Sequence, residues 1–155
     1  MDCTIQIDSR EKAHAIQKIL TTFDQRGIKW FVSKLPVGDY QSLDNPRLAI
    51  DRKQNLSELC GNVCQQHERF KAELIRANQF GIKLIILCEH GGSIRSLQDV
   101  IGWHNPRLKE SPMAVSGERL YKILSAMSAK YGVDLVFCDK RQTGAKIIEL
   151  LEAHK

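Results

Sequence analysis

Asp39, Asp51 and Lys53 have side chains and a spacing that could do chemistry together. Asp39 stands at the start of an expected strand over 39–43, and Asp51 stands near the end of another over 48–52. If these strands pair antiparallel, the two carboxylates meet at one edge of the sheet. Lys53 then faces the same way as Asp51, because side chains two apart on a strand share a face.

A divalent cation suits such a pair of acids. Two carboxylates about 4 Å apart repel by about 4 kcal/mol at an effective dielectric of 20, so a cation should lie between them. Mg²⁺ (or Mn²⁺) is typically held by one or two carboxylates, with water and phosphate completing its coordination. The ion would polarise a phosphodiester and lower the pKa of its bound water, and Lys53 could orient that water. The alternative is that all three residues are solvated charges at strand ends.

Apolar periodicity predicts the elements that must position these residues: one α/β domain with a mixed sheet flanked by helices. Strands are expected over 4–8, 29–35, 39–43, 48–52, 82–88 and 133–138. The second and third should form a hairpin through Pro36-Val37-Gly38. Helices are expected over 15–27, 56–80 with a possible break near its middle, 94–102, 120–131 and 145–154.

The totals fit one ordinary globular domain of 155 residues, with 43% hydrophobic and 26% charged residues. No apolar run approaches the roughly 20 residues that span a bilayer, and no secretory signal is present, so we expect a cytoplasmic protein without a membrane partner. The net charge of +5 suits a polyanionic partner without identifying one.

Three ordered motifs resemble a known family. "IDSRE" (7–11), "LPVGDY" (35–40) and "IDRK" (50–53) are similar to the nuclease domain of the XPF-type structure-specific endonucleases, which belong to the PD-(D/E)xK superfamily. The segment 70–89 resembles the helix and strand that follow in that family. The resemblance covers residues 4 to about 90 and implies a restriction-endonuclease-like fold. XPF-type enzymes commonly carry helix-hairpin-helix modules after this domain, but the chain has no room for them, so we expect a single domain, 1–155, without such a module.

The resemblance also implies roles for individual residues. Asp39 and Asp51, with Asp8, would bind Mg²⁺ or Mn²⁺, and Lys53 would support the attacking water. The charged surround that positions metal and phosphate would comprise Asp8, Arg10, Glu11 and Arg52. Without the resemblance, residues 8–11 are equally compatible with a helix N-terminus that has an acid or serine cap.

The implied activity is hydrolysis of phosphodiester bonds in branched or structured DNA, such as a flap, fork or Holliday junction, in recombination or repair. Family members pair through this domain, so a homodimer is expected. A compact nuclease of this kind would fit such a role in a bacterium or a phage-infected cell. The alternative function is a catalytically inactive, nuclease-like subunit that binds DNA or serves as a scaffold; such subunits tend to lose the acid-x-Lys signature.

Two positions depart from the family pattern. Asp51 replaces the usual Glu, and Ser57 occupies the place of the family's closing Asp, with Glu58 one residue later. On an unbroken helix Glu58 shares a stripe with Asn62, Gln65 and Arg69 that could face the site. Asn55 and Glu58 also have the spacing of a capping box, and this interpretation is favoured.

Further residues could contact DNA. Trp103, Arg107 and Lys109 lie in one loop that could stack on bases and bind phosphate, although Trp103 could equally pack beneath its own loop. The full set of candidate DNA contacts is Arg10, Arg52, Arg69, Trp103, Arg107 and Lys109. A zinc site formed by Cys60, Cys64 and His67 is a weaker alternative, because no fourth ligand follows in sequence.

Overall fold

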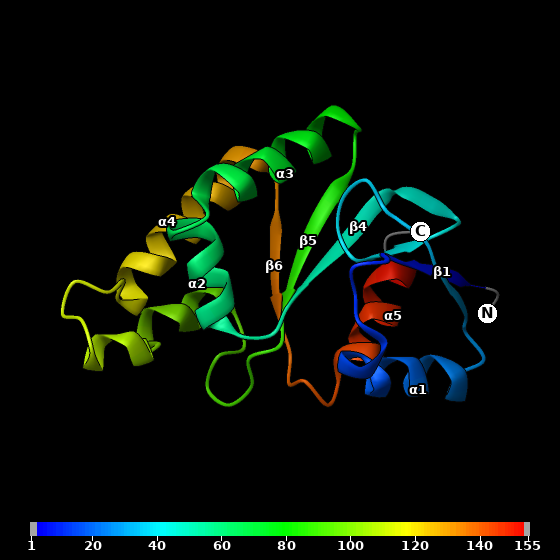
Figure 1. Cartoon of the computed structure of the whole chain (residues 1–155), viewed down its shortest axis with the longest axis horizontal. Coiled ribbons are helices and arrows are strands. Elements are labelled where there is room, and N and C mark those ends of the chain that lie inside the picture. The colour runs from blue at the N-terminus through cyan, green and yellow to red at the C-terminus, as the bar shows by residue number, and fades with distance from the viewer. Residues whose placement is uncertain (1–2, 154–155) are drawn as a thin grey trace.

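The computed structural model describes residues 3–153. A six-stranded mixed sheet crosses the molecule in the order β2-β1-β3-β4-β5-β6 (Figure 1). The strands are β1 (Thr4–Ile7), β2 (Lys29–Val32), β3 (Tyr40–Ser42), β4 (Asn45–Lys53), β5 (Lys83–Cys88) and β6 (Asp134–Phe137). The predicted α/β fold with a mixed sheet is confirmed.

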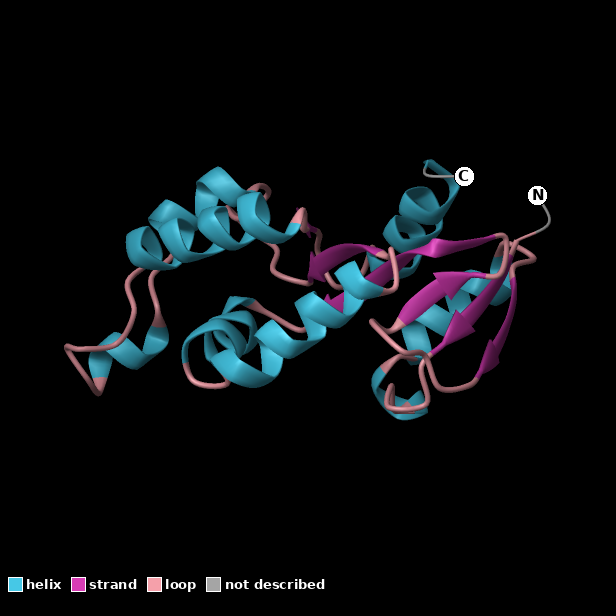
Figure 2. Ribbon diagram, turned by 90° about the horizontal axis from the view of Figure 1, so that it is seen from above, coloured by secondary structure: helices cyan, strands magenta, loops and turns pink. Residues whose placement is uncertain are grey.

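Helices cover the two faces of the sheet unevenly (Figures 1 and 2). On one face, α1 (Gln17–Gln25) packs against α5 (Thr143–Ala153). On the other, α2 (Leu56–Cys64), α3 (His67–Gln79) and α4 (Gly117–Tyr131) pack together. Short 3-10 helices span Ala13–Ala15, Leu97–Gly102 and Pro106–Lys109.

The predicted hairpin between residues 29–35 and 39–43 is wrong. β1 lies between β2 and β3, parallel to the first and antiparallel to the second. The connection crosses the end of β1, where the Ser33 amide donates to the Ile7 carbonyl (3.0 Å) and the Asp8 amide donates to the Asp39 carbonyl (2.8 Å). Helix α1 makes the parallel β1–β2 pairing possible, since parallel neighbours need a long crossover connection.

Alternation along β4 divides its side chains between two cores. Ile50 belongs to the core under α1 and α5, and Ala49 belongs to the core under α2, α3 and α4. At the carboxyl end of the strand, Asp51 and Lys53 continue the Ala49 face, and Arg52 continues the Ile50 face. The fold therefore separates Arg52 from its two charged neighbours in sequence.

Candidate active site

Backbone pairing between β3 and β4 brings Asp39 beside the end of β4. Tyr40 is opposite Ile50, and the Asp39 amide donates to the Ile50 carbonyl (2.8 Å). The Arg52 amide in turn donates to Asp39 Oδ2 (2.8 Å). The predicted antiparallel pairing of these strands is confirmed, and with it the approach of Asp39 to Asp51.

Gly38 makes this approach possible. Its φ of +75° lies in the left-handed region, and a Cβ there would stand 3.0 Å from the Ala49 Cβ and 3.1 Å from the Ile50 carbonyl oxygen. Only glycine fits both the conformation and the space. The turn that presents Asp39 therefore depends on the glycine of the "GDY" motif.

Asp51 and Lys53 form a buried pair on the face covered by α2 and α3. Lys53 Nζ lies 3.2 Å from Asp51 Oδ2. Lys53 is 8% exposed and Asp51 is 4% exposed. Lys53 Nζ also lies 5.3 Å from the centre of the Phe70 ring. Apart from this ion pair, the buried Asp51 Oδ2 accepts no hydrogen bond from the described residues.

The electrostatics of the two aspartates favour a cation beside them. Burial raises the pKa of Asp39 well above its ordinary value, and the neighbouring Asp51 carboxylate raises it further. Burial alone would lower the pKa of Lys53, but the Asp51 carboxylate outweighs this and raises the pKa. Lys53 therefore stays an ammonium group at neutral pH and can offset negative charge but cannot accept a proton.

Glu73, on α3, is a site residue that the sequence reasoning missed. Its half-buried carboxylate lies near Asp51 and Lys53, and burial together with the nearby Asp51 raises its pKa. Glu73 stands next to Leu74 and one turn from Phe70, both buried. The sequence signal that could have identified Glu73 as a site residue is an acidic residue next to the apolar stripe of a helix.

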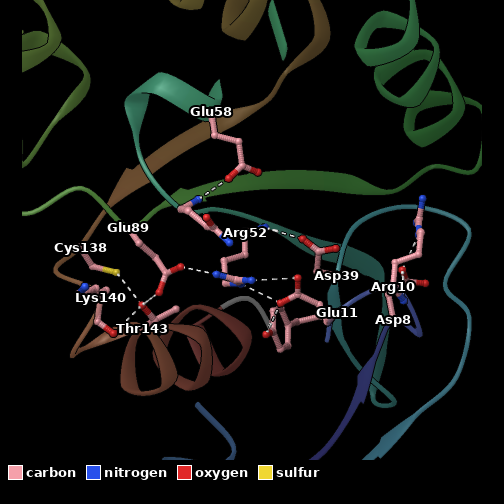
Figure 3. A network of polar contacts seen from close by, with 12 residues as sticks. Asp8, Arg10, Glu11, Asp39, Arg52, Glu58, Glu89, Cys138, Lys140 and Thr143 are labelled. Carbon is pink, nitrogen blue, oxygen red and sulfur yellow. Dashed lines mark hydrogen bonds and ion pairs between the residues drawn. The ribbon is translucent and has the colours of Figure 1, made fainter. Parts of the chain in front are cut away.

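Arg52 and Glu11, predicted in the charged surround, bind each other beneath the opposite face (Figure 3). Arg52 Nε donates to Glu11 Oε2 (2.7 Å), and Arg52 Nη1 forms an ion pair with Glu89. Tyr40 donates its hydroxyl to Glu11 Oε2 (2.7 Å), and Thr143 donates to Glu89. All three charged side chains are about nine-tenths buried, so the Arg52 guanidinium is occupied inside the fold rather than turned toward a phosphate.

Asp8, predicted as a further metal ligand, binds other groups in the structure. It is fully buried, and its carboxylate accepts hydrogen bonds from the Leu35 amide (2.8 Å) and from Arg10 Nε (2.6 Å). Among residues 3–153, no three His, Cys, Asp or Glu side chains are grouped to hold a metal ion. Asp8 instead anchors the loop leading to Asp39, and the exposed Arg10 stays near the site, where Glu73 and Asp39 act on its pKa.

The predicted helix cap is confirmed for Asn55, while the return bond of Glu58 goes to Gln54, one residue before the cap. The Glu58 amide donates to Asn55 Oδ1 (2.8 Å), and Glu58 Oε2 accepts from the Gln54 amide (3.0 Å). The alternative stripe does not continue to Arg69, because the helix breaks at Gln65-Gln66 and Arg69 is an exposed residue of α3. The break also places the exposed His67 at the start of α3, and no zinc site forms within 3–153.

The loop proposed for base stacking has a structural role at its centre. Trp103 is 8% exposed and belongs to the core beneath α4. Arg107 and Lys109 lie on the 3-10 helix Pro106–Lys109, and both are exposed, Arg107 in a hollow beside α2. Packing, rather than stacking on DNA, is what the structure shows for Trp103.

Comparison with known proteins fits this geometry. A family model, the ERCC4 domain, matches residues 7–151. The chain belongs to the ERCC4 domain family. Comparison with curated proteins finds no match.

Solved structures share the fold of this ERCC4 domain. XPF from Aeropyrum pernix superposes with a TM-score of 0.68 at 21% identity, over 97% of this chain and 64% of that one. The same protein in complex with DNA gives a TM-score of 0.66 at 18% identity, over 98% of this chain and 64% of that one. This chain thus spans somewhat less than two thirds of the XPF chains it matches, and the predicted XPF-type fold is confirmed.

Proposed function

We propose that this ERCC4 domain is a divalent-metal-dependent endonuclease that hydrolyses phosphodiester bonds in branched DNA. The observation that carries the proposal is the approach of Asp39, whose Oδ2 accepts from the Arg52 amide (2.8 Å), to the buried Asp51, whose Oδ2 has no hydrogen-bond partner among the described residues and lies 3.2 Å from Lys53 Nζ. Buried carboxylates in contact are costly unless a cation neutralises them. Family membership makes DNA the expected substrate, and one XPF relative has been solved with DNA.

Asp39 and Asp51 are the residues that would hold the ion. Oxygen donors are the ligands that Mg²⁺ and Mn²⁺ prefer, and two carboxylates suffice when water and phosphate complete the coordination. When bound, such an ion supplies Lewis-acid chemistry that polarises the phosphodiester. Lys53 would hold a fixed positive charge next to the reacting phosphate, and the exposed guanidinium of Arg10 could bind phosphate oxygens.

Residues on the opposite face of β4 would position the site rather than take part in the reaction. Arg52, held by Glu11 and Glu89, fixes the backbone whose amide binds Asp39.

Within residues 3–153, none of the helices has the length and apolar character of a membrane span. The homodimer and the choice among flap, fork and Holliday junction remain predictions of the family resemblance.

A cleavage assay tests the proposed function. The wild type should nick labelled flap, fork or four-way-junction DNA with Mg²⁺ or Mn²⁺ and not with EDTA. Asp51→Asn and Lys53→Ala should each lower the rate at least about 100-fold, since even outer partners of metal ligands cost 10–100-fold.

Asp134→Asn and Lys83→Ala are matched controls. These residues form an exposed ion pair (3.1 Å) at the amino ends of β5 and β6, and the rates of both variants should stay within about twofold of wild type. Tight DNA binding without cleavage by any form, in any metal, would favour the inactive-subunit alternative.

A further inference from the structure

Exposed basic side chains lie around two neighbouring hollows near the carboxyl ends of the strands. These hollows lie on the face of the sheet opposite to that of Asp51. The first, of about 440 Å³, lies between the start of α1 and the loop after β6, and its lining includes His14, Lys18 and Lys140. The second, of about 720 Å³, lies between the loop after β5 and α5, and its lining includes Arg95. We name Lys18, Arg95 and Lys140 the basic edge.

The two hollows adjoin. Glu89 and Lys140 line the first, and the next residue along the chain in each case, His90 and Arg141, lines the second. In Figure 3, Lys140 lies at the Glu89 end of the polar network, and Asp39 lies at the other end, with Arg52 between them.

The acids around these hollows already have partners. Glu89 binds Arg52 and Thr143, Asp139 binds Arg141 (3.0 Å), and Glu149 pairs with Lys146 (3.4 Å). By contrast, within residues 3–153 the exposed Lys18, Arg95 and Lys140 form no ion pair with an acid. The basic edge therefore carries positive charge that is not neutralised inside the protein.

The basic edge and the candidate active site meet at the carboxyl end of β4. Asp51 and Lys53 lie on one face of that strand and Arg52 on the other, and Gln54 and Asn55, which follow directly, help line the first hollow. A phosphate chain that passes over this end of the strand can contact both sides. A straight duplex bound on the Asp51 side has no need to do so.

We propose that the basic edge binds the phosphate backbone of a second arm of branched DNA, while the first arm lies at Asp39 and Asp51. This inference rests on the proposed function and adds to it the surface that distinguishes branched from linear DNA. Phosphate contacts position a nucleic acid without reading its sequence, and their energy arises largely from the release of counterions. Each lysine that contacts a phosphate contributes about 0.9 to the slope of log K against log salt concentration.

The test is equilibrium binding in EDTA, where no cleavage occurs, to a four-way junction and to a linear duplex of equal length across a salt series. The variant is Lys18→Ala combined with Lys140→Ala. The control removes the same charge from α4, on the other face of the sheet, by Lys122→Ala combined with Lys130→Ala, both exposed. Thermal unfolding verifies that each variant folds.

We expect the basic-edge variant to bind the junction on the order of 10- to 100-fold more weakly at 0.1 M salt, with the salt slope reduced by about 2. Its binding to the linear duplex should match that of the control. Equal losses in the basic-edge and control variants, or equal losses on junction and duplex, would overturn the inference.

The outcomes separate this inference from the proposed function. If the wild type cuts no DNA but the basic-edge variant loses junction binding selectively, the nuclease proposal fails and the second-arm surface stands. If the wild type cuts junctions and the basic-edge variant binds them as the control does, the second-arm surface fails alone.

Discussion

At the scale of single residues, Asp39 and Asp51 are brought together by backbone hydrogen bonds and by the Gly38 turn. Burial and the Asp51 carboxylate raise the pKa of Asp39, so an unligated site carries an electrostatic cost. Sites of this kind exchange stability for function. Removing the charge of Asp39 should therefore raise the stability of the metal-free protein and lower its activity.

Asp39→Asn should stabilise the metal-free protein at pH 7.5 by about 1–2 kcal/mol while abolishing cleavage. Asparagine keeps the acceptor for the Arg52 amide and removes the repulsion. Because the folded pKa of Asp39 is raised above its ordinary 3.8, the folded state binds more protons than the unfolded state, and the wild type loses stability as pH rises above 3.8.

The advantage of Asp39→Asn should therefore grow as pH rises from 4 to 7, as measured by urea unfolding in EDTA. Added Mg²⁺ should stabilise the wild type and leave the variant unchanged. An asparagine variant that is less stable than wild type at every pH would contradict this explanation.

At the scale of elements, Arg52 joins β4 to the segments on either side of it. Its guanidinium binds Glu11, which precedes the first 3-10 helix, and Glu89, which follows β5. Tyr40 of β3 and Thr143 of α5 complete the arrangement. The network thus fixes β4, which carries Asp51, and the start of β3, which directly follows Asp39.

Arg52→Gln should lower the free energy of unfolding by about 3–5 kcal/mol, because it leaves the buried Glu11 and Glu89 without their cation. Lys83→Ala, which breaks an exposed pair, should cost less than about 1 kcal/mol. Urea unfolding measures both. If Arg52→Gln left stability unchanged but weakened DNA binding, Arg52 would be a phosphate contact instead.

Sequence patterns predicted the elements well where periodicity is local. The spacing of Asn55 and Glu58 predicted the helix cap, and the pairing of residues 39–43 with 48–52 followed from strand order. The false hairpin arose because turn residues such as Pro36 and Gly38 also suit a connection that crosses a third strand. Spacing in sequence cannot show which strand lies between two others.

The site residues show the same limit. Arg52 sits between Asp51 and Lys53 in sequence, but alternation along β4 turns it to the other face. Glu73 approaches Asp51 and Lys53 from α3, and this position depends on how α3 packs on the sheet. Both features follow from tertiary placement rather than from a local motif.

At the scale of the whole molecule, the candidate chemistry collects at one edge of the sheet. Asp51 and Lys53 end β4, Glu89 follows β5 and Lys140 follows β6, and these three strands are parallel neighbours. In open α/β sheets, ligands bind outside the carboxyl ends of parallel strands. The placement of metal site and basic edge on opposite faces of this one edge suits a substrate with more than one arm.

The most direct test of the central claim is an anomalous difference map from crystals of the wild type soaked in Mn²⁺. We expect a peak bonded to carboxylate oxygens of both Asp39 and Asp51, near the distance of about 2.1 Å that Mg²⁺ takes, and its loss in Asp51→Asn. Strong anomalous peaks elsewhere, with none between these two aspartates, would contradict the account.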